Sequence, residues 1–178
     1  MPTLRLATSA DVPAIRTLIE VSVRGLAVGF YSDAEIEESL VSVFGIDSQL
    51  LSDQTYFVID CSGAIAAAGG WSRRATLYGG DQTKASDDAL LDPAVDAARI
   101  RAFYVAPQWA RRGFARQLYL ACESAAVAAG FHRFQLGATL SGVPLYEALG
   151  FRALDRADYP MRFGLTLGIV RMERGIDQ

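Results

Sequence analysis

Helical periodicity marks the first quarter of the chain. Thr8 or Asp11 can cap a helix whose apolar positions recur three or four residues apart. These positions are Val12, Ile15, Leu18, Ile19 and Val23. Ser32 and Glu35 then form a capping-box pattern, which predicts a second helix with a buried stripe of Ile36, Leu40 and Val43. Two helices are therefore expected before the main part of the sheet.

Strand-type runs are short and follow the helical region, apart from a first strand expected over Thr3–Ala7. Thr55–Asp60 is β-branched and aromatic, and Ala64–Trp71 is apolar and rich in alanine and glycine. Because residues 61–63 supply a turn between them, the two runs predict an antiparallel hairpin. Further strands are expected over residues 100–105, 134–138, 151–155 and 165–173.

Two later helices alternate with these strands. Arg112–Ala129 ends at Gly130 and Val143–Leu149 ends at Gly150, since glycine readily takes the left-handed conformation that closes a helix. The expected buried face of the longer helix is Phe114, Leu118, Cys122, Ala125 and Ala129. Gly79–Ala98 is polar and predicts a long loop with about one helical turn. The segments predict one α/β domain over residues 1–178, a mixed, mostly antiparallel sheet of about seven strands flanked by about four helices.

Composition narrows the class of protein. The 178 residues fit one domain, and 51% hydrophobic with 21% charged residues is globular composition. Apolar runs are shorter than the roughly 20 residues of a membrane span, so no membrane partner is expected. The chain does not open with a basic and then an apolar region, and Cys61 and Cys122 lack metal-type or redox-type spacing, so a reduced cytoplasmic protein without bound metal is expected. A net charge of −3 offers no footprint for a nucleic acid.

The stretch Val105–Ala115 carries the strongest chemical signal. It joins the end of an apolar strand to the start of a helix, and Arg111, Arg112 and Arg116 lie at the positive end of that helix. Like charges are unfavourable there unless an anion lies among them. A phosphate group meets this requirement, and Gly113 lets it approach the backbone closely because glycine has no Cβ. The alternative is an ordinary turn glycine followed by a solvated basic face.

A second motif, Tyr-Glu-Ala-Leu-Gly-Phe at Tyr146–Phe151, follows at a suitable distance. With the order strand, Arg/Gly-rich turn, helix, strand, helix, it resembles the GNAT superfamily of acetyl-CoA dependent N-acetyltransferases over most of the chain. The first motif of that family commonly reads Gln/Arg-x-x-Gly-x-Gly/Ala. Gly113 and Ala115 match its last two defined positions, whereas Ala110 replaces the leading side chain. The resemblance implies that acetyl-CoA is the co-substrate and binds between two central parallel strands that splay apart.

The resemblance also implies roles for single residues. Backbone groups at the strand end would pair with the pantetheine arm, and those at the helix start would bind the pyrophosphate with help from arginine side chains. These coenzyme-binding residues are Phe103, Tyr104, Val105, Arg111, Arg112, Gly113, Phe114, Ala115 and Arg116. Tyr146 matches the tyrosine that protonates the departing CoA thiolate, and an ordinary tyrosine pKa of about 10 keeps it protonated. The alternative is a core tyrosine beside Leu145 and Leu149.

No residue is predicted to be the general base. Gln135 stands where several GNAT members carry a glutamate, and glutamine cannot usefully accept a proton. A water held by Thr139 or Ser141, or Asp81 reaching in from the loop, remain as alternatives. By the same resemblance the acceptor pocket would include Tyr31, Trp71, Arg73 and Arg74, although Trp71 equally fits a half-buried core position. His132, the only histidine, is expected to be exposed.

The predicted activity is direct transfer of an acetyl group from acetyl-CoA to a primary amine, with a strand amide near Val105 polarising the thioester oxygen. A non-catalytic acyl-CoA binding or sensing module is the main alternative, because no base is evident and Ala110 departs from the motif. A Rossmann-type nucleotide enzyme is disfavoured, since Gly-x-Gly-x-x-Gly does not follow the first strand. A homodimer is compatible with the hydrophobic content.

Overall fold

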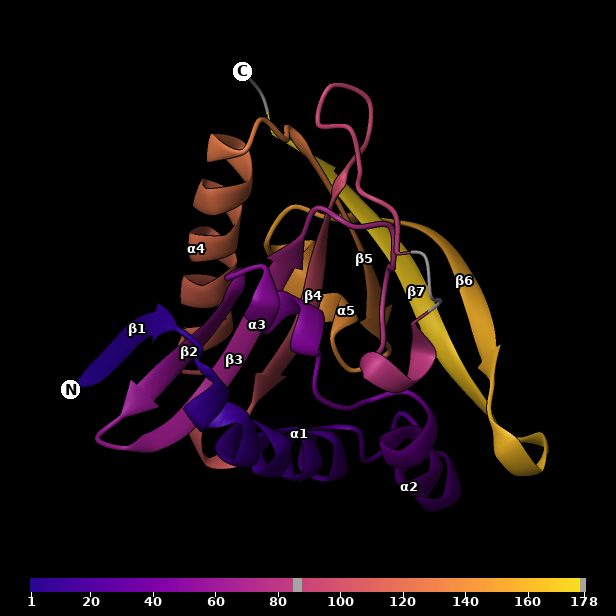
Figure 1. The fold of residues 1–178 in the computed structure, drawn as a ribbon. Coiled ribbons are helices and arrows are strands. Elements are labelled where there is room, and N and C mark those ends of the chain that lie inside the picture. Colours follow the sequence, from indigo (N-terminus) through magenta and orange to yellow (C-terminus); the bar gives the residue numbers. More distant parts are fainter. Residues whose placement is uncertain (85–87, 177–178) are drawn as a thin grey trace.

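A mixed seven-stranded sheet organises the fold (Figure 1). In this computed structural model, which describes residues 1–84 and 88–176, the strand order is β1-β2-β3-β4-β5-β7-β6. Neighbouring strands are antiparallel except for the parallel pair β4 and β5. The strands are β1 (Pro2–Leu6), β2 (Tyr56–Cys61), β3 (Ala64–Ser72), β4 (Ala98–Val105), β5 (Arg133–Thr139), β6 (Arg152–Pro160) and β7 (Thr166–Gly175). The expected mixed, mostly antiparallel sheet is confirmed.

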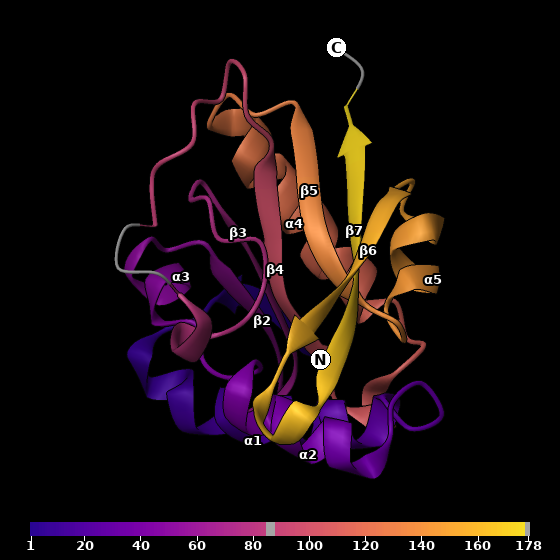
Figure 2. The same ribbon diagram turned by 90° about the vertical axis from the view of Figure 1, so that its right-hand side faces the viewer.

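Helices cover both faces of this sheet. α4 (Phe114–Ala128) packs against β2, β3 and β4, and α1 (Val12–Leu26) packs against β3 and β4. Side chains alternate across β4, so that Phe103 joins an apolar cluster with α4 whereas Tyr104 joins the cluster with α1. The other helices are α2 (Asp33–Ser42), α3 (Ser48–Ser52) and α5 (Val143–Ala148). Figure 2 shows α4 behind the sheet and α1 and α2 along its lower end. None of the described helices is long and apolar enough to cross a membrane.

The second predicted helix, α2, begins with the capping box expected from Ser32 and Glu35. The N–H of Glu35 donates to Ser32 Oγ at 3.2 Å, and the N–H of Ser32 donates to Glu35 Oε2 at 2.8 Å. α2 buries Ile36, and Val43 is buried directly after it, as expected. The middle of the stripe was predicted wrongly, because Leu40 is only half-buried and the buried positions there are Glu38 and Ser39.

Two features of the helices differ from the sequence expectation. α4 begins at Phe114, two residues later than expected, because Gly113 has a left-handed φ of 80° and acts as its N-cap. Its buried face contains Tyr119 and Ala126 in place of Ala125 and Ala129, since several alanines left the stripe poorly defined. α3 was not predicted at all; it is a five-residue helix capped by Asp47, and it makes five helices in the described residues rather than about four.

β4 and β5 are paired only near their starts. Their register joins Ala98 to Phe134 and Arg99 to Gln135, and beyond these pairs the strands separate (Figure 2). In β4, Ala102 has a φ of 55° and lies in a bulge, so that β4 has an extra residue opposite Gly69 of β3. A bulge bends its strand, which supports the divergence of β4 from β5. The splayed central strands implied by the family resemblance are present.

Candidate functional site

A cleft of about 730 Å³ passes between β4 and β5 where the two strands diverge. One end borders α5 and the start of α4, and the other borders the end of α1 and the α1–α2 connection. Tyr146 lines this cleft together with eight of the nine predicted coenzyme-binding residues. The eight are Phe103, Tyr104, Val105, Arg111, Gly113, Phe114, Ala115 and Arg116. The structure thus brings the strand end, the helix start and the tyrosine to one cavity.

The start of α4 forms the basic end of the cleft. Gly113 has a φ of 80°, and Arg111 two residues earlier also has a positive φ, of 64°. Positive φ at alternate residues turns successive N–H groups to one side, and first-turn N–H groups have no partner within the helix. A Cβ built on Gly113 would meet no atom within 4 Å, so the space in front of the backbone is open. This end therefore offers donors and partial positive charge to an anion.

The three arginines of the predicted phosphate site take different positions. Arg111 and Arg116 line the cleft, whereas the Arg112 guanidinium lies 4.8 Å from the centre of the Trp109 ring. That cation–π contact engages Arg112 outside the cleft lining. The first turn of α4, which the structure describes in full, contains no acidic residue to neutralise the other two. The geometry favours Arg111 and Arg116 as anion ligands.

The edge of β4 that faces the cleft carries the backbone groups predicted to pair with the pantetheine arm. Beyond Arg99 this edge has no strand pairing with β5. The N–H of Val105 donates to Ser22 Oγ of α1 at 3.3 Å, which is long for a hydrogen bond. Ser22 is buried and also lines the cleft. The N–H of Val105, which is predicted to polarise the thioester oxygen, is therefore held by a long, weak hydrogen bond in this structure.

Tyr146 lies on α5 against the wall of the cleft. Its ring centre is 6.3 Å from that of Phe103 and 5.8 Å from that of Phe151. The side chain is half-buried, and burial raises the pKa of its hydroxyl above the usual value of 10. Tyr146 is thus packed among aromatic rings, as its core alternative requires, and it also lines the cleft.

Tyr31 is the one predicted acceptor-pocket residue that lines the cleft among the described residues. Its hydroxyl donates to the carbonyl of Gly168 at 2.7 Å and accepts from the N–H of Leu140 at 2.9 Å. Burial raises the pKa of this hydroxyl. Tyr31 therefore ties the α1–α2 connection to β7 and to the segment after β5, at the open end of the splay.

The other three predicted acceptor-pocket residues lie elsewhere. Trp71 is 3% exposed and packs against Phe131, with ring centres 6.1 Å apart. The guanidinium of Arg73 covers the Trp71 ring, and Arg74 binds Asp53 at 2.8 Å. The prediction was wrong because Trp71 pairs with Ile100 near the start of β4, where β4 and β5 have not yet separated.

Two of the residues considered for proton transfer line the cleft. The hydroxyl oxygens of Thr139 and Ser141 are 3.1 Å apart and both residues face the cavity. Asp81 instead accepts from the N–H of Ser48 at 3.0 Å and does not line it. Gln135 accepts from Arg99 at 2.9 Å, at the closed end of the strand pair. Within residues 1–84 and 88–176, no aspartate, glutamate or histidine lines the cleft.

Sequence reasoning missed most of the lining on the α1 side. These side chains are apolar or aromatic: Leu26, Phe30, Phe44, Leu77 and Tyr78. It also missed Arg101, whose guanidinium lies 2.9 Å from Asp47 and donates to the carbonyls of Thr76, at 3.0 Å, and Gly79. This contact fixes residues 76–79 beside the cleft. The one available signal was the aromatic pair after Gly29 in a short helix connection, where polar residues are usual.

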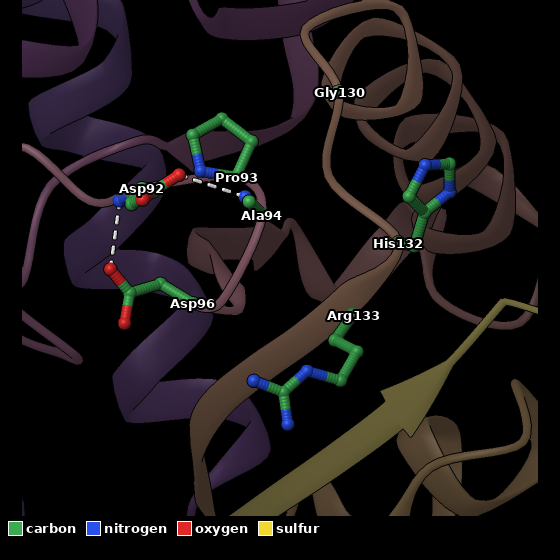
Figure 3. Close-up of a pocket in the computed structure, with 7 residues that line it drawn as sticks. All are labelled: Asp92, Pro93, Ala94, Asp96, Gly130, His132 and Arg133. Carbon is green, nitrogen blue, oxygen red and sulfur yellow. Dashed lines mark hydrogen bonds between the residues drawn. The ribbon is translucent and has the colours of Figure 1, made fainter.

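A second cavity, of about 680 Å³, lies between residues 92–96 and 130–133 (Figure 3). Its carboxylates serve a local turn, because Asp96 Oδ2 accepts from the N–H of Asp92 at 2.7 Å and Asp92 Oδ1 accepts from that of Ala94 at 2.9 Å. His132 is exposed, as predicted, and points away from these carboxylates (Figure 3). The described residues contain no group of three or more His, Cys, Asp or Glu side chains able to hold a metal ion.

Comparison with known families bears on what the first cleft does. Residues 91–161, which include β4, the start of α4 and Tyr146, match the family described as acetyltransferase (GNAT) domain. Over this stretch the chain carries a GNAT acetyltransferase domain. The GNAT family expected from the two sequence motifs is confirmed over residues 91–161, and the match supports an acetyltransferase.

Several solved structures are similar to this chain over almost its whole length. A GCN5-related N-acetyltransferase from Rhodopseudomonas palustris has 20% identity and a TM-score of 0.74, covering 99% of this chain and 96% of its own. PaiA N-acetyltransferase from Thermoplasma acidophilum, in complex with coenzyme A, has 13% identity and a TM-score of 0.69, with coverages of 98% and 99%. The yncA protein of Salmonella typhimurium, with its cofactor acetyl-CoA, has 18% identity and a TM-score of 0.61, with coverages of 100% and 95%. These likenesses show the GNAT fold. No curated protein matches the sequence.

Proposed function

We propose that this GNAT protein transfers the acetyl group of acetyl-CoA to a primary amine by direct attack, with both substrates bound at once. The observation that carries the proposal is the cleft through the sheet, which is lined at one end by an open, basic helix start and by Tyr146. Holding amine and thioester together in such a cleft supplies most of the rate advantage in this kind of reaction.

The chain offers a place for each part of the coenzyme. N–H groups of Gly113 to Arg116 and the side chains of Arg111 and Arg116 would bind the pyrophosphate. The free edge of β4 from Phe103 to Val105 would pair with the amides of the pantetheine arm as a neighbouring strand does. Unpaired donors and the open space in front of Gly113 fit an anionic group of this kind.

Three groups of the chain would then act on the reacting atoms. As the amine nitrogen bonds to the carbonyl carbon and the carbon–sulfur bond breaks, Tyr146 would donate its proton to the departing sulfur. The N–H of Val105, released from Ser22, would donate to the carbonyl oxygen as it gains negative charge. The proton lost by the amine would leave through water held by the hydroxyls of Thr139 and Ser141.

The test is an assay of the purified protein with acetyl-CoA and a broad panel of primary amines. A thiol reagent reports free CoA, and mass spectrometry reports the acetylated amine. We expect release of CoA that depends on the amine and matches the product formed. Binding of acetyl-CoA with no transfer to any amine would overturn the proposal in favour of a non-catalytic acyl-CoA module, which is compatible with a described cleft lining free of carboxylates.

A further inference from the structure

The α1 side of the cleft is apolar and aromatic. Since the start of α4 provides the anion-binding end, we call the opposite portion the acceptor half; its residues are Leu26, Phe30, Tyr31, Phe44, Leu77 and Tyr78. Phe30 is 50% exposed, so apolar surface is open to an incoming molecule. Phe44 and Tyr78 are held by edge-on contacts with Tyr104 and Tyr159, at ring distances of 6.3 and 5.8 Å. The acceptor half is therefore a preformed surface for an apolar group.

Among the described residues, no aspartate or glutamate side chain lines this surface. The charged side chains that line the whole cleft are Arg101, Arg111 and Arg116, and the last two belong to the phosphate end. Arg101 is buried and bound to Asp47, which is buried as well, so this pair adds no free charge. A cationic group in the acceptor half would lose water without gaining a counter-charge, which is costly.

Two carboxylates on the bordering elements are already bound by basic side chains, whereas Glu35 of α2, whose charge acts on the Tyr31 hydroxyl, accepts from the N–H of Ser32 in the capping box. Glu38 of α2 accepts from Arg162 through both oxygens, at 2.8 and 3.1 Å. Asp47, directly before α3, is bound by Lys84 as well as by Arg101. An acceptor with a second cation would have to compete with these contacts, because charge-assisted pairs of this kind are strong.

We propose that the acceptor is a monoamine with an apolar body, an aliphatic or aromatic primary amine that carries no second cation. This inference rests on the proposed acetyl transfer and names its substrate class. The amine would lie at the β4–β5 splay while its apolar part packs against Phe30, Phe44 and Tyr78.

The proposal also bears on the missing general base. An amine that leaves water for an apolar surface has a lowered pKa, because burial disfavours the ammonium form. A larger share of the amine is then neutral and able to attack near neutral pH. No carboxylate is needed to remove its proton, in agreement with the lining of the described cleft.

A matched pair of acceptors tests the inference. n-Pentylamine and 1,5-diaminopentane have the same carbon chain and differ only in a second ammonium group. We expect kcat/KM to be about tenfold or more higher for n-pentylamine, although the diamine has two reactive ends. 2-Phenylethylamine against spermidine extends the comparison to an aromatic body and a longer polycation.

Two glutamate substitutions test whether the preference for monoamines arises in the acceptor half. Phe30→Glu places a carboxylate in the acceptor half and is expected to raise kcat/KM for 1,5-diaminopentane relative to n-pentylamine by about tenfold. Val28→Glu is the matched control, because Val28 is 65% exposed on the same connection and does not line the cleft. It should leave the preference unchanged. Circular dichroism of both variants verifies folding.

The outcomes separate this inference from the proposed function. Transfer that prefers the apolar monoamines in both pairs supports the inference. Transfer that is equal for the two classes, or faster to the diamine, spermidine or a lysine peptide, overturns it while acetyl transfer stands. Binding of acetyl-CoA without transfer to any amine removes the proposed function and the inference together.

Discussion

At the scale of single residues, Tyr146 is the group whose chemistry decides between a catalyst and a binding module. It lies where α5 meets the cleft, and its ring contacts Phe103 of β4, the strand expected to hold the pantetheine arm. Burial raises its pKa, so the hydroxyl keeps its proton through the neutral range and can serve only as an acid there. A leaving thiolate is the group in the proposed reaction that needs a proton.

Tyr146→Phe removes that proton and little else, because the phenylalanine ring keeps the contacts with Phe103 and Phe151. We expect kcat to fall by about 100-fold, the lower range for loss of a general acid, with the Kd for acetyl-CoA unchanged. Steady-state kinetics and calorimetry measure the two quantities. Tyr159→Phe, which lies outside the cleft lining, is the control. An unaltered kcat for Tyr146→Phe would return this residue to a packing role.

At the scale of elements, the start of α4 forms the basic end of the cleft, where we propose that the coenzyme pyrophosphate binds. Its first turn contains no acidic residue, Gly113 leaves the backbone open, and Arg111 and Arg116 add positive charge from the same side. Arg112, bound over Trp109, contributes less at the cleft. The start of α4 therefore predicts that Arg111 and Arg116 contribute more to coenzyme binding than Arg112 does.

Replacement of these arginines by glutamine tests that inequality. Arg116→Gln is expected to weaken CoA binding by about fivefold, since an exposed charge pair contributes about 1 kcal/mol or less. Arg112→Gln should change the affinity by less than about twofold. Titration calorimetry at low and high salt gives the values, and the Arg116→Gln effect should shrink at high salt. Equal losses for the two variants would contradict the assignment.

The sequence predicted the structural features that depend on adjacent residues. It did not predict those that depend on contacts between segments far apart in the chain. The capping box at Ser32 and the hairpin turn at residues 61–63 depend on a few adjacent residues, so the sequence indicated them. The bulge at Ala102 depends on the register between β4 and β3, and no local pattern marks it. α3 is too short to show a periodicity. The motif around Gly113 located the basic end of the cleft because it, too, depends on a few adjacent residues.

At the scale of the whole molecule, contacts between distant segments hold the cleft together. Tyr31 joins the α1–α2 connection to β7, and Arg162, between β6 and β7, binds Glu38 of α2. The acceptor half is assembled from these separate segments, which explains why sequence reasoning found Tyr31 but missed Phe44 and Tyr78. Which face of a helix meets a distant loop is a property of the assembled fold.

The contact between Arg162 and Glu38 makes stability depend on pH. The Arg162 guanidinium, with the Ser42 hydroxyl, lowers the pKa of Glu38 to about 2 from an ordinary value of 4.5. A lowered carboxyl pKa stabilises the folded state above 4.5, and the contribution is lost as pH falls from 4.5 towards 2. Arg162→Met should therefore lower the urea midpoint at neutral pH, and the difference from the unaltered protein should narrow across this interval.

Urea unfolding at a series of pH values measures this difference. Arg156→Met is the control, because the ion pair of Arg156 with Asp158 is exposed and 3.5 Å long and should contribute little to the urea midpoint. A difference between Arg162→Met and the unaltered protein that stays constant from neutral pH down to about 2 would show that the Glu38 carboxylate does not contribute through its charge.

The central claim is that the cleft between β4 and β5 binds acetyl-CoA, and a titration of the purified protein with acetyl-CoA tests it most directly. Calorimetry should show saturable heat at one site per chain. At about 100 times Kd the bound protein gains about 2.7 kcal/mol, which for a chain of this size raises Tm by about 5 to 10 °C. Neither heat nor a change in Tm at millimolar acetyl-CoA would contradict the claim.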